Sequence, residues 1–281
     1  MQRAWEVRRT CFPPKIYFDY PSRTLALSVT GKYCALNCDH CGGYYLASMK
    51  PVEEAHRYLG FASSFLISGG CDHTGKVPVL AKLEEIKAIA PGHRLNWHVG
   101  FITEEEALAI APYVNVVSFD FVGDDETIAR VYHLKKTVRD YMETYRMLRK
   151  HFKVIPHITI GLDGGATGHE RKALKLLAGE GVEGLVFIVF IPTPNTPYAF
   201  RSPPPPEEVA SILAEARLLF PETPLALGCM RPHGSYRKEL DPLAVMAGVN
   251  RIVNPSYEGV QKALELGLAI ERTSECCALD L

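Results

Sequence analysis

The sequence predicts an α/β protein built on a (β/α)8 barrel of the TIM type. Eight short apolar segments recur along the 281 residues, and stretches with helical periodicity lie between them. Strands that are apolar along their whole length are typical of a parallel sheet covered by helices. Eight strand and helix repeats are the number that closes a barrel. A partial, open barrel of six strands with extra elements is the alternative.

The predicted strands are apolar runs that end in glycine, proline or polar residues. They are TLALSVTG (24–31), SFLISGG (64–70), RLNWHVG (94–100), VNVVSFDFVG (114–123), KVIPHITIGL (153–162), GLVFIVFIP (184–192), PLALGCM (224–230) and GVNRIVNP (248–255). The predicted helices carry acidic residues early and often basic residues late, a polarity that complements the helix dipole. The clearest cover 103–113, 138–151, 168–181 and 206–220.

Composition limits the class of protein. With 47% apolar residues the chain can bury a large core, and a formal net charge of -1 offers no footprint for nucleic acid or anionic lipid. No apolar run reaches the roughly 20 residues that cross a membrane, and the N-terminus lacks an apolar signal segment, so we expect a cytoplasmic protein. We expect one domain over 1–281, with an N-terminal extension (1–23) and a C-terminal extension (256–281) that cover the barrel mouth.

Three of the eight cysteines are clustered in CALNCDHC (34–41), directly after the first predicted strand. A disulfide framework is not expected, because the cytosol keeps thiols reduced. Thiolates suit iron–sulfur clusters or zinc, and Cys34, Cys38 and Cys41 can each take one iron of a cubane cluster and leave its fourth iron open. A zinc site to which His40 contributes is the alternative.

Further candidates fall where the carboxyl ends of the predicted strands meet. Functional groups of such barrels lie at this end, the mouth, so we expect one polar site there. Besides the three clustered cysteines, its members are Gly69, Gly70, Cys71, Asp72, Asn96, His98, Ser118, Asp120, His157, Thr159, Asp163, Cys229 and Arg231.

The C-x3-C-x2-C spacing of Cys34, Cys38 and Cys41 resembles that of radical S-adenosylmethionine (SAM) enzymes. The resemblance implies a [4Fe-4S] cluster whose open iron binds the methionine part of SAM. Electron transfer into the sulfonium then releases a 5′-deoxyadenosyl radical, which abstracts hydrogen. His40 occupies the position where the family usually has an aromatic residue that touches adenine.

Other segments are similar to the same family. ISGGCD (67–72) matches its Gly-Gly pair for the SAM amino group, which implies that role for Gly69 and Gly70, although Cys71 displaces the usual acid. ITIGLDGG (158–165) resembles the glycine motif near adenine, which implies Gly161. We expect Asp120 to contact the SAM ribose or the substrate, or to cap the next helix. Arg231 is expected to pair with the SAM carboxylate or a substrate carbonyl, or to form a loop salt bridge.

Within the family, the segment 225–253 resembles the last two strands of biotin synthase and its relatives. The ligands of the sulfur-donating cluster of biotin synthase do not carry over, because Leu66, Asn96 and Ile155 replace its cysteines and Cys229 its arginine. Five other cysteines are present, and four of them would hold a second cluster: Cys11, Cys71, Cys229, Cys276 and Cys277. This combination looks most like a subunit of the two-component lipoyl synthases, which insert sulfur into a protein-bound octanoyl chain.

That resemblance implies three partners: a related radical SAM subunit, an octanoylated lipoyl-carrier protein and an electron donor such as ferredoxin. Two alternatives remain open. One is another radical SAM enzyme of the biotin synthase-like branch, which rearranges a carbon skeleton or matures a cofactor without sulfur insertion. The other is a non-catalytic iron–sulfur or zinc protein.

Overall fold

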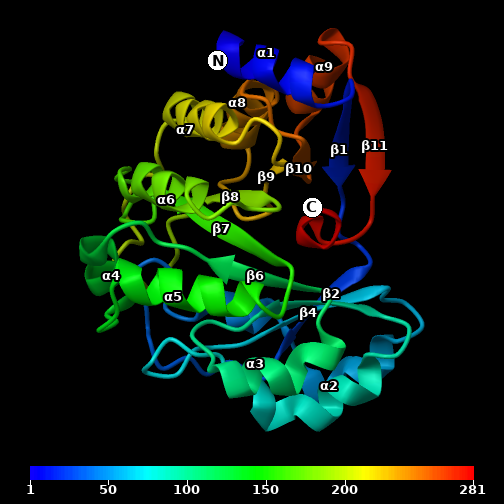
Figure 1. Ribbon diagram of the computed structural model, residues 1–281, viewed down its shortest axis with the longest axis vertical. Coiled ribbons are helices and arrows are strands. Elements are labelled where there is room, and N and C mark those ends of the chain that lie inside the picture. Colours follow the sequence, from blue (N-terminus) through cyan, green and yellow to red (C-terminus); the bar gives the residue numbers. More distant parts are fainter.

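The computed structural model describes residues 1–281 and contains one curved, all-parallel sheet with helices on its outer face (Figure 1). The sheet order is β11-β1-β10-β9-β8-β7-β6-β5-β4-β2-β3. The strands are β1 (Lys15–Asp19), β2 (Thr24–Ser28), β3 (Lys50–Pro51), β4 (Ser64–Ser68), β5 (Arg94–His98), β6 (Val116–Asp120), β7 (Val154–Ile160), β8 (Leu185–Val189), β9 (Leu225–Leu227), β10 (Arg251–Val253) and β11 (Ala269–Thr273). The α-helices are α1 (Gln2–Cys11), α2 (Leu83–Ile89), α3 (Glu104–Ile110), α4 (Asp125–Tyr132), α5 (Val138–Arg149), α6 (His169–Ala178), α7 (Pro206–Leu219), α8 (Ser235–Met246) and α9 (Tyr257–Glu265). The 3-10 helices are η1 (Tyr44–Ser48), η2 (Val52–Tyr58), η3 (Val79–Lys82), η4 (Ala111–Tyr113) and η5 (Cys277–Asp280).

All eight predicted strands are present, as β2 and β4 through β10. The prediction of an α/β barrel of the TIM type is therefore confirmed in class. The sheet remains open, because its order ends at β11 on one side and β3 on the other. The alternative prediction of a partial, open barrel therefore describes the sheet best. The sheet has eight core strands, whereas that alternative expected six.

The predicted helices begin where the sequence supplies caps. Thr103 accepts a hydrogen bond from the Glu106 backbone N–H, and the Glu106 side chain accepts one from the Thr103 N–H, so a capping box starts α3. Thr137 and Asp140 form a second capping box at α5. The proline run leads directly into α7, whose first residue is Pro206.

The N-terminal extension forms part of the barrel wall instead of a cover over the mouth. β1 pairs with both β10 and β11, and α1 packs against α7 and α8 (Figure 1). Ala4 and Arg8 are the buried residues of α1, and Arg8 donates to the Pro13 carbonyl at 3.0 Å. The sheet edge beside β10 has free hydrogen-bonding groups, and β1 satisfies them.

The C-terminal segment fills the amino end of the barrel. The prediction that it covers the mouth, at the opposite end, is therefore wrong. Cys277, Leu279 and Leu281 pack in a small apolar cluster with Val116 and Ile155. Val116 is the first residue of β6, and Ile155 is the second residue of β7. Apolar residues of the segment complete the inner core there, and acidic residues beside them pair with arginines at the same end.

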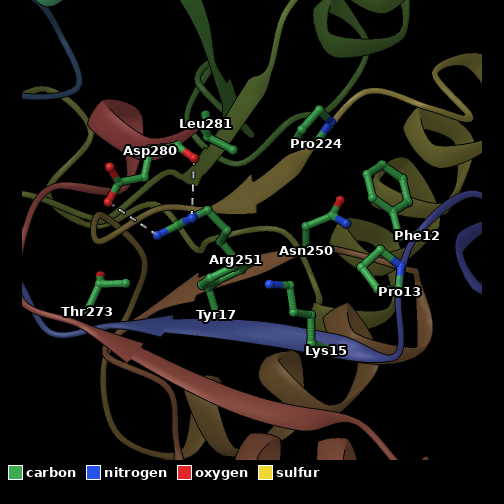
Figure 2. A pocket seen from close by; sticks show the side chains of 10 residues that line it. All are labelled: Phe12, Pro13, Lys15, Tyr17, Pro224, Asn250, Arg251, Thr273, Asp280 and Leu281. Carbon is green, nitrogen blue, oxygen red and sulfur yellow. Dashed lines mark hydrogen bonds and ion pairs between the residues drawn. The ribbon is translucent and has the colours of Figure 1, made fainter.

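Arginines at the amino ends of two strands form these ion pairs. Arg94, the first residue of β5, contacts Glu275 at 2.7 Å and Asp280 at 2.8 Å. Figure 2 shows Arg251 reaching from β10 towards Asp280, next to Tyr17, in a cavity of about 420 Å³. Arg251 also pairs with buried Asp19 at 2.7 Å, so its positive charge is neutralised by carboxylates of the same chain.

No helix of the structure combines the length and the apolar character that a membrane crossing requires.

Candidate functional site

A cavity of about 330 Å³ lies at the carboxyl ends of the strands, as predicted for the mouth. Its wall includes the last residues of β4, β5 and β6, which are Ser68, His98 and Asp120. A smaller cavity of about 130 Å³ adjoins it and is lined in part by Ser118. The structure brings most of the predicted candidates into this lining: Cys34, Cys38, His40, Cys41, Gly69, Gly70, Cys71, His98, Asp120 and Thr159.

The loop that carries the three clustered cysteines curls under the cavity. Asn37, Gly42 and Gly43 adopt positive φ angles of 49°, 51° and 73°, which fold the loop back on itself. The donor atoms of Cys38, His40 and Cys41 all lie within 4.8 Å of one another. The local conformation therefore brings Cys38 and Cys41 together with His40, and Cys34 lies in the wall of the same cavity outside this group.

Helix α4 and the segment after β8 hold this loop from outside. Asp39 pairs with His133 at 2.7 Å, and its backbone N–H donates to the Val131 carbonyl at 2.9 Å. The Asp39 carbonyl accepts a hydrogen bond from the Tyr198 N–H at 3.3 Å. Anchoring at one residue between Cys38 and Cys41 fixes both thiols relative to the barrel.

Gly69 and Gly70 form the turn against which the loop rests. A Cβ at Gly70 would lie 2.0 Å from the Tyr33 carbonyl oxygen and 2.6 Å from the Cys34 Cα. The Gly70 N–H donates to Thr30 Oγ1 at 2.7 Å, and the Ala35 N–H donates to the Cys71 carbonyl at 2.8 Å. Gly70 is thus required for the close approach of two backbone segments.

The thiols of the loop perturb one another strongly. The hydrogen bond between Cys38 and Cys41 lowers the pKa of Cys41 to about 4 and, together with burial, raises the pKa of Cys38. Burial raises the pKa of Cys71 to about 12, and the nearby Cys34 charge adds to this effect. The lowered pKa of Cys41 favours its thiolate, which is the form that binds metals.

The fit of this loop to a metal centre rests on its donor set and on one orphaned atom. The donor atoms of Cys38, His40 and Cys41 converge there, Cys34 lines the same cavity, and Nδ1 of His40 is buried without a hydrogen-bond partner. Buried polar atoms in native proteins normally have a partner, so an unpartnered one indicates a bound group. The residues present therefore fit a metal centre bound through thiolates, such as an iron–sulfur cluster.

Asp120 and His98 face the cavity, and His157 packs beside His98. His98 Nδ1 lies 3.9 Å from Asp120 Oδ2, and the His98 and His157 rings pack edge to face at 5.3 Å. Burial lowers the pKa of each histidine to about 4 and raises the pKa of Asp120. The Asp120 side chain is 52% accessible, because it opens into the enclosed cavity. Both imidazoles are accordingly neutral at pH 7.

The remaining cysteines divide into three locations. Cys71 belongs to the mouth cavity, and Cys11 is exposed at the end of α1 on the outside of the barrel. Cys229, Cys276 and Cys277 are close enough inside the barrel for their charges to interact. Asn96 donates to Cys276 Sγ at 3.5 Å. These three thiols influence one another's pKa values but do not form a metal-ligand group like that of Cys38, His40 and Cys41.

Arg231 does not face the cavity, which corrects its predicted role. Its side chain is 0% exposed and pairs with Asp241 at 3.0 Å through both Nε and Nη2. Its Nη1 donates to the carbonyls of Gly228 and Val253. All three guanidinium nitrogens of Arg231 donate hydrogen bonds within the core. The structure therefore contains a salt bridge of Arg231, which was the alternative prediction.

Arg231→Met is therefore expected to unfold the protein more easily without affecting SAM binding. Loss of the arginine leaves Asp241 buried without its cation, which costs roughly 3 to 5 kcal/mol of stability. Urea denaturation measures this change, and Arg272→Met, at an exposed position, is the control. An unchanged midpoint combined with a raised KM for SAM would restore the predicted cofactor contact.

Gly161 also has a structural role in the backbone. Its φ is 74°, and a Cβ there would lie 2.6 Å from Pro204 Cδ, but the residue is not part of the cavity wall. Several residues of the cavity wall were not predicted from the sequence: Leu36, Tyr132, Ile188, Phe190 and Met230. Tyr132 stacks edge to face on His40 at 5.3 Å. A tyrosine at the end of an amphipathic helix carries no sequence signal that separates this position from an ordinary core contact.

No protein-family model matches the chain, and no curated protein matches it in sequence. Solved structures match it in fold. Methylornithine synthase (PylB) matches with a TM-score of 0.66 at 15% identity, over 96% of this chain and 87% of that protein. The FeFe-hydrogenase maturase HydG from Carboxydothermus hydrogenoformans matches with a TM-score of 0.67 at 15% identity, over 99% and 72%.

The chain shares the fold of methylornithine synthase and of HydG. A third match, SuiB from Streptococcus suis, has a TM-score of 0.55 at 11% identity and covers 82% of this chain and 51% of that protein. At these identities the likeness concerns the architecture alone. The cysteine loop and the Gly-Gly turn at the mouth are the local features that agree with this fold.

Proposed function

We propose that the chain is a radical SAM enzyme in which Cys34, Cys38 and Cys41 hold a [4Fe-4S] cluster beside SAM. One observation carries this proposal: the three cysteines meet at the carboxyl-end cavity, directly against the Gly69-Gly70 turn. When bound, the cluster and SAM supply a 5′-deoxyadenosyl radical that removes hydrogen from an unactivated C–H bond, which side-chain acids and bases cannot do.

The chain's own residues bind and orient the reactants in this proposal. The backbone at Gly69 and Gly70 receives the amino-acid part of SAM, and His40 with Tyr132 offers an aromatic edge to its base. Asp120 offers acceptor oxygens to ribose hydroxyls or to the substrate. The apolar wall on β8 keeps water away from the reacting carbon.

We further propose that the reaction delivers sulfur to a protein-bound octanoyl chain, as in a lipoyl synthase subunit. Cys229, Cys276 and Cys277 are the cysteines that would hold the second iron–sulfur cluster, since Cys276 and Cys277 are adjacent in the chain and Cys229 is near enough to influence their pKa values. Asn96 and Ser118 support this arrangement, because Ser118 donates to Asn96 at 2.9 Å and Asn96 donates to Cys276. The proposed partners are the related radical SAM subunit, the octanoylated lipoyl-carrier protein and a ferredoxin-type electron donor.

The test is product analysis of anaerobically reconstituted protein with SAM, reductant, the partner subunit and octanoylated carrier. We expect 5′-deoxyadenosine together with a carrier whose octanoyl chain has gained sulfur, detected by mass spectrometry of the lysine peptide. Formation of 5′-deoxyadenosine with an unchanged carrier would reject sulfur insertion and leave the radical SAM assignment standing.

A carbon-skeleton rearrangement is the second candidate, and the fold similarity to methylornithine synthase favours it. This function needs no second cluster, so Cys229, Cys276 and Cys277 would be ordinary free thiols. Incubation with free amino acids, with analysis for isomers of unchanged mass, distinguishes the rearrangement from sulfur insertion.

A further inference from the structure

The segment after β8 contacts the cysteine loop through Tyr198. The Tyr198 N–H donates to the Asp39 carbonyl at 3.3 Å. Asp39 lies between Cys38 and Cys41 in the sequence. The Tyr198 residue is 7% exposed, and its ring packs edge to face on Phe190, a residue of the mouth cavity, at 6.0 Å. One buried residue therefore touches both the loop and a residue of the cavity wall.

The Tyr198 hydroxyl reaches a different element of the mouth. It donates to Asp163 Oδ1 at 2.8 Å, in the turn after β7. The other carboxylate oxygen of Asp163 accepts a hydrogen bond from Arg130 of α4. Asp163 was a predicted member of the polar site, but it is absent from the cavity wall. Its carboxylate joins two elements of the mouth instead.

These contacts close into a ring of hydrogen bonds. Arg130 is followed by Val131, whose carbonyl accepts a hydrogen bond from the Asp39 N–H at 2.9 Å. The hydrogen-bond ring consists of Asp39, Tyr198, Asp163, Arg130 and Val131. It joins the cysteine loop, the segment after β8, the turn after β7 and α4. Such a ring restrains the loop from two sides, and loss of one link removes the restraint that the links provide together.

A second hydrogen bond attaches the same segment to the chain beyond Cys41. The Tyr45 hydroxyl and Thr193 Oγ1 lie 2.9 Å apart, and Thr193 is 1% exposed. Thr196 Oγ1 donates to the Thr193 carbonyl at 2.8 Å, which stiffens the segment between its two contacts. The segment from Thr193 to Tyr198 therefore holds the chain before and after Cys41.

From these contacts we infer that Tyr198 is a positioning residue, whose hydroxyl fixes the Cys38 and Cys41 thiols relative to each other through the hydrogen-bond ring. The inference rests on the proposed function, in which these cysteines hold the cluster. Tyr198 touches no reacting atom, since it is absent from the cavity wall. It acts on the loop through Asp39 and through Asp163. Ligands that are already ordered lose less conformational freedom when they bind, so they hold a metal centre more firmly.

Tyr198→Phe tests this inference, because it removes the hydroxyl and keeps the aromatic side chain that packs on Phe190. We expect a chelator to remove iron from the reconstituted holoenzyme at least about fivefold faster than from the wild type, the factor that corresponds to about one hydrogen bond. The electron paramagnetic resonance spectrum of the reduced cluster should broaden, since the loop then adopts several conformations. Tyr236→Phe is the matched control, because the Tyr236 hydroxyl donates to the Pro204 carbonyl at 2.6 Å, in the same segment but outside the hydrogen-bond ring. It should leave iron release and the spectrum unchanged.

Combination with Arg130→Met distinguishes a ring from separate contacts. Once Tyr198→Phe has opened the ring, Arg130→Met should change the rate of iron release by less than about twofold, whereas independent contacts would multiply their effects. Equal iron release from the wild type and Tyr198→Phe would overturn the inference. Multiplied effects in the double variant would overturn it as well.

Failure of the proposed function gives a different result. Hydrogen exchange of the iron-free protein reports on the loop without any cluster. Peptides that cover 34–45 should exchange faster in Tyr198→Phe than in the wild type or Tyr236→Phe. A wild type that binds no iron but shows this difference would reject the cluster and keep the role of Tyr198 in the loop. Equal exchange in the three proteins would reject the positioning role.

Discussion

Gly70→Ala is expected to reduce SAM cleavage at least about a hundredfold, since displacement of a reacting group by about 1 Å has effects of this size. The new Cβ would lie 2.0 Å from the Tyr33 carbonyl oxygen and 2.6 Å from the Cys34 Cα. Both contacts involve backbone, which cannot rotate away as a side chain end can. The loop must shift, and the Cys34 thiol shifts with it. Anaerobic assays of 5′-deoxyadenosine and of bound iron measure the loss.

Gly60→Ala is the matched control for this substitution. Gly60 has no atom within 4 Å of an added Cβ and lies in an exposed turn before β4. Its stability and activity should stay within about 0.5 kcal/mol and a factor of two of the wild type. If Gly70→Ala retained normal iron content and activity, the close approach of the turn to the cysteine loop would not matter for function.

Replacement of Cys229, Cys276 and Cys277 together by serine is expected to remove about half of the iron, roughly four ions per chain, and all sulfur transfer. SAM cleavage should persist, because Cys34, Cys38 and Cys41 lie in a separate cavity at the mouth. Iron and acid-labile sulfide analysis of anaerobically prepared protein measures the change. Cys11→Ser is the control, since Cys11 is exposed on α1 and should leave the iron content unaltered.

Iron content that stays the same in the triple serine variant would exclude a second cluster at these cysteines. That outcome would favour the rearrangement candidate, which needs one cluster only. It would leave Cys277 as a small apolar core residue, in keeping with its place beside Val116 and Leu279.

The strands and the cysteine loop were predictable because their signals are local. Runs such as TLALSVTG and GLVFIVFIP are apolar on both faces, which only a buried parallel strand tolerates. Helices α3 and α5 carry their caps within four residues of their start. The spacing of Cys34, Cys38 and Cys41 likewise fits into one loop, so the site could be placed after the first core strand.

The errors concern contacts between residues far apart in the chain. β1 completes the edge beside β10, and its partner residues Tyr17 and Arg251 are separated by most of the sequence. The C-terminal segment enters the amino end because Arg94 pairs with Glu275 there. Sequence spacing likewise gave no sign that Asp241, ten residues further on, takes up the charge of Arg231.

The most direct test of the radical SAM assignment compares the wild type with Cys34→Ala, Cys38→Ala and Cys41→Ala combined. After anaerobic reconstitution and chemical reduction, the wild type should convert SAM to 5′-deoxyadenosine and methionine. The triple alanine variant should form none above background while keeping the iron of the second cluster. Absence of 5′-deoxyadenosine with the iron-loaded wild type, or its undiminished formation by the variant, would contradict the central claim.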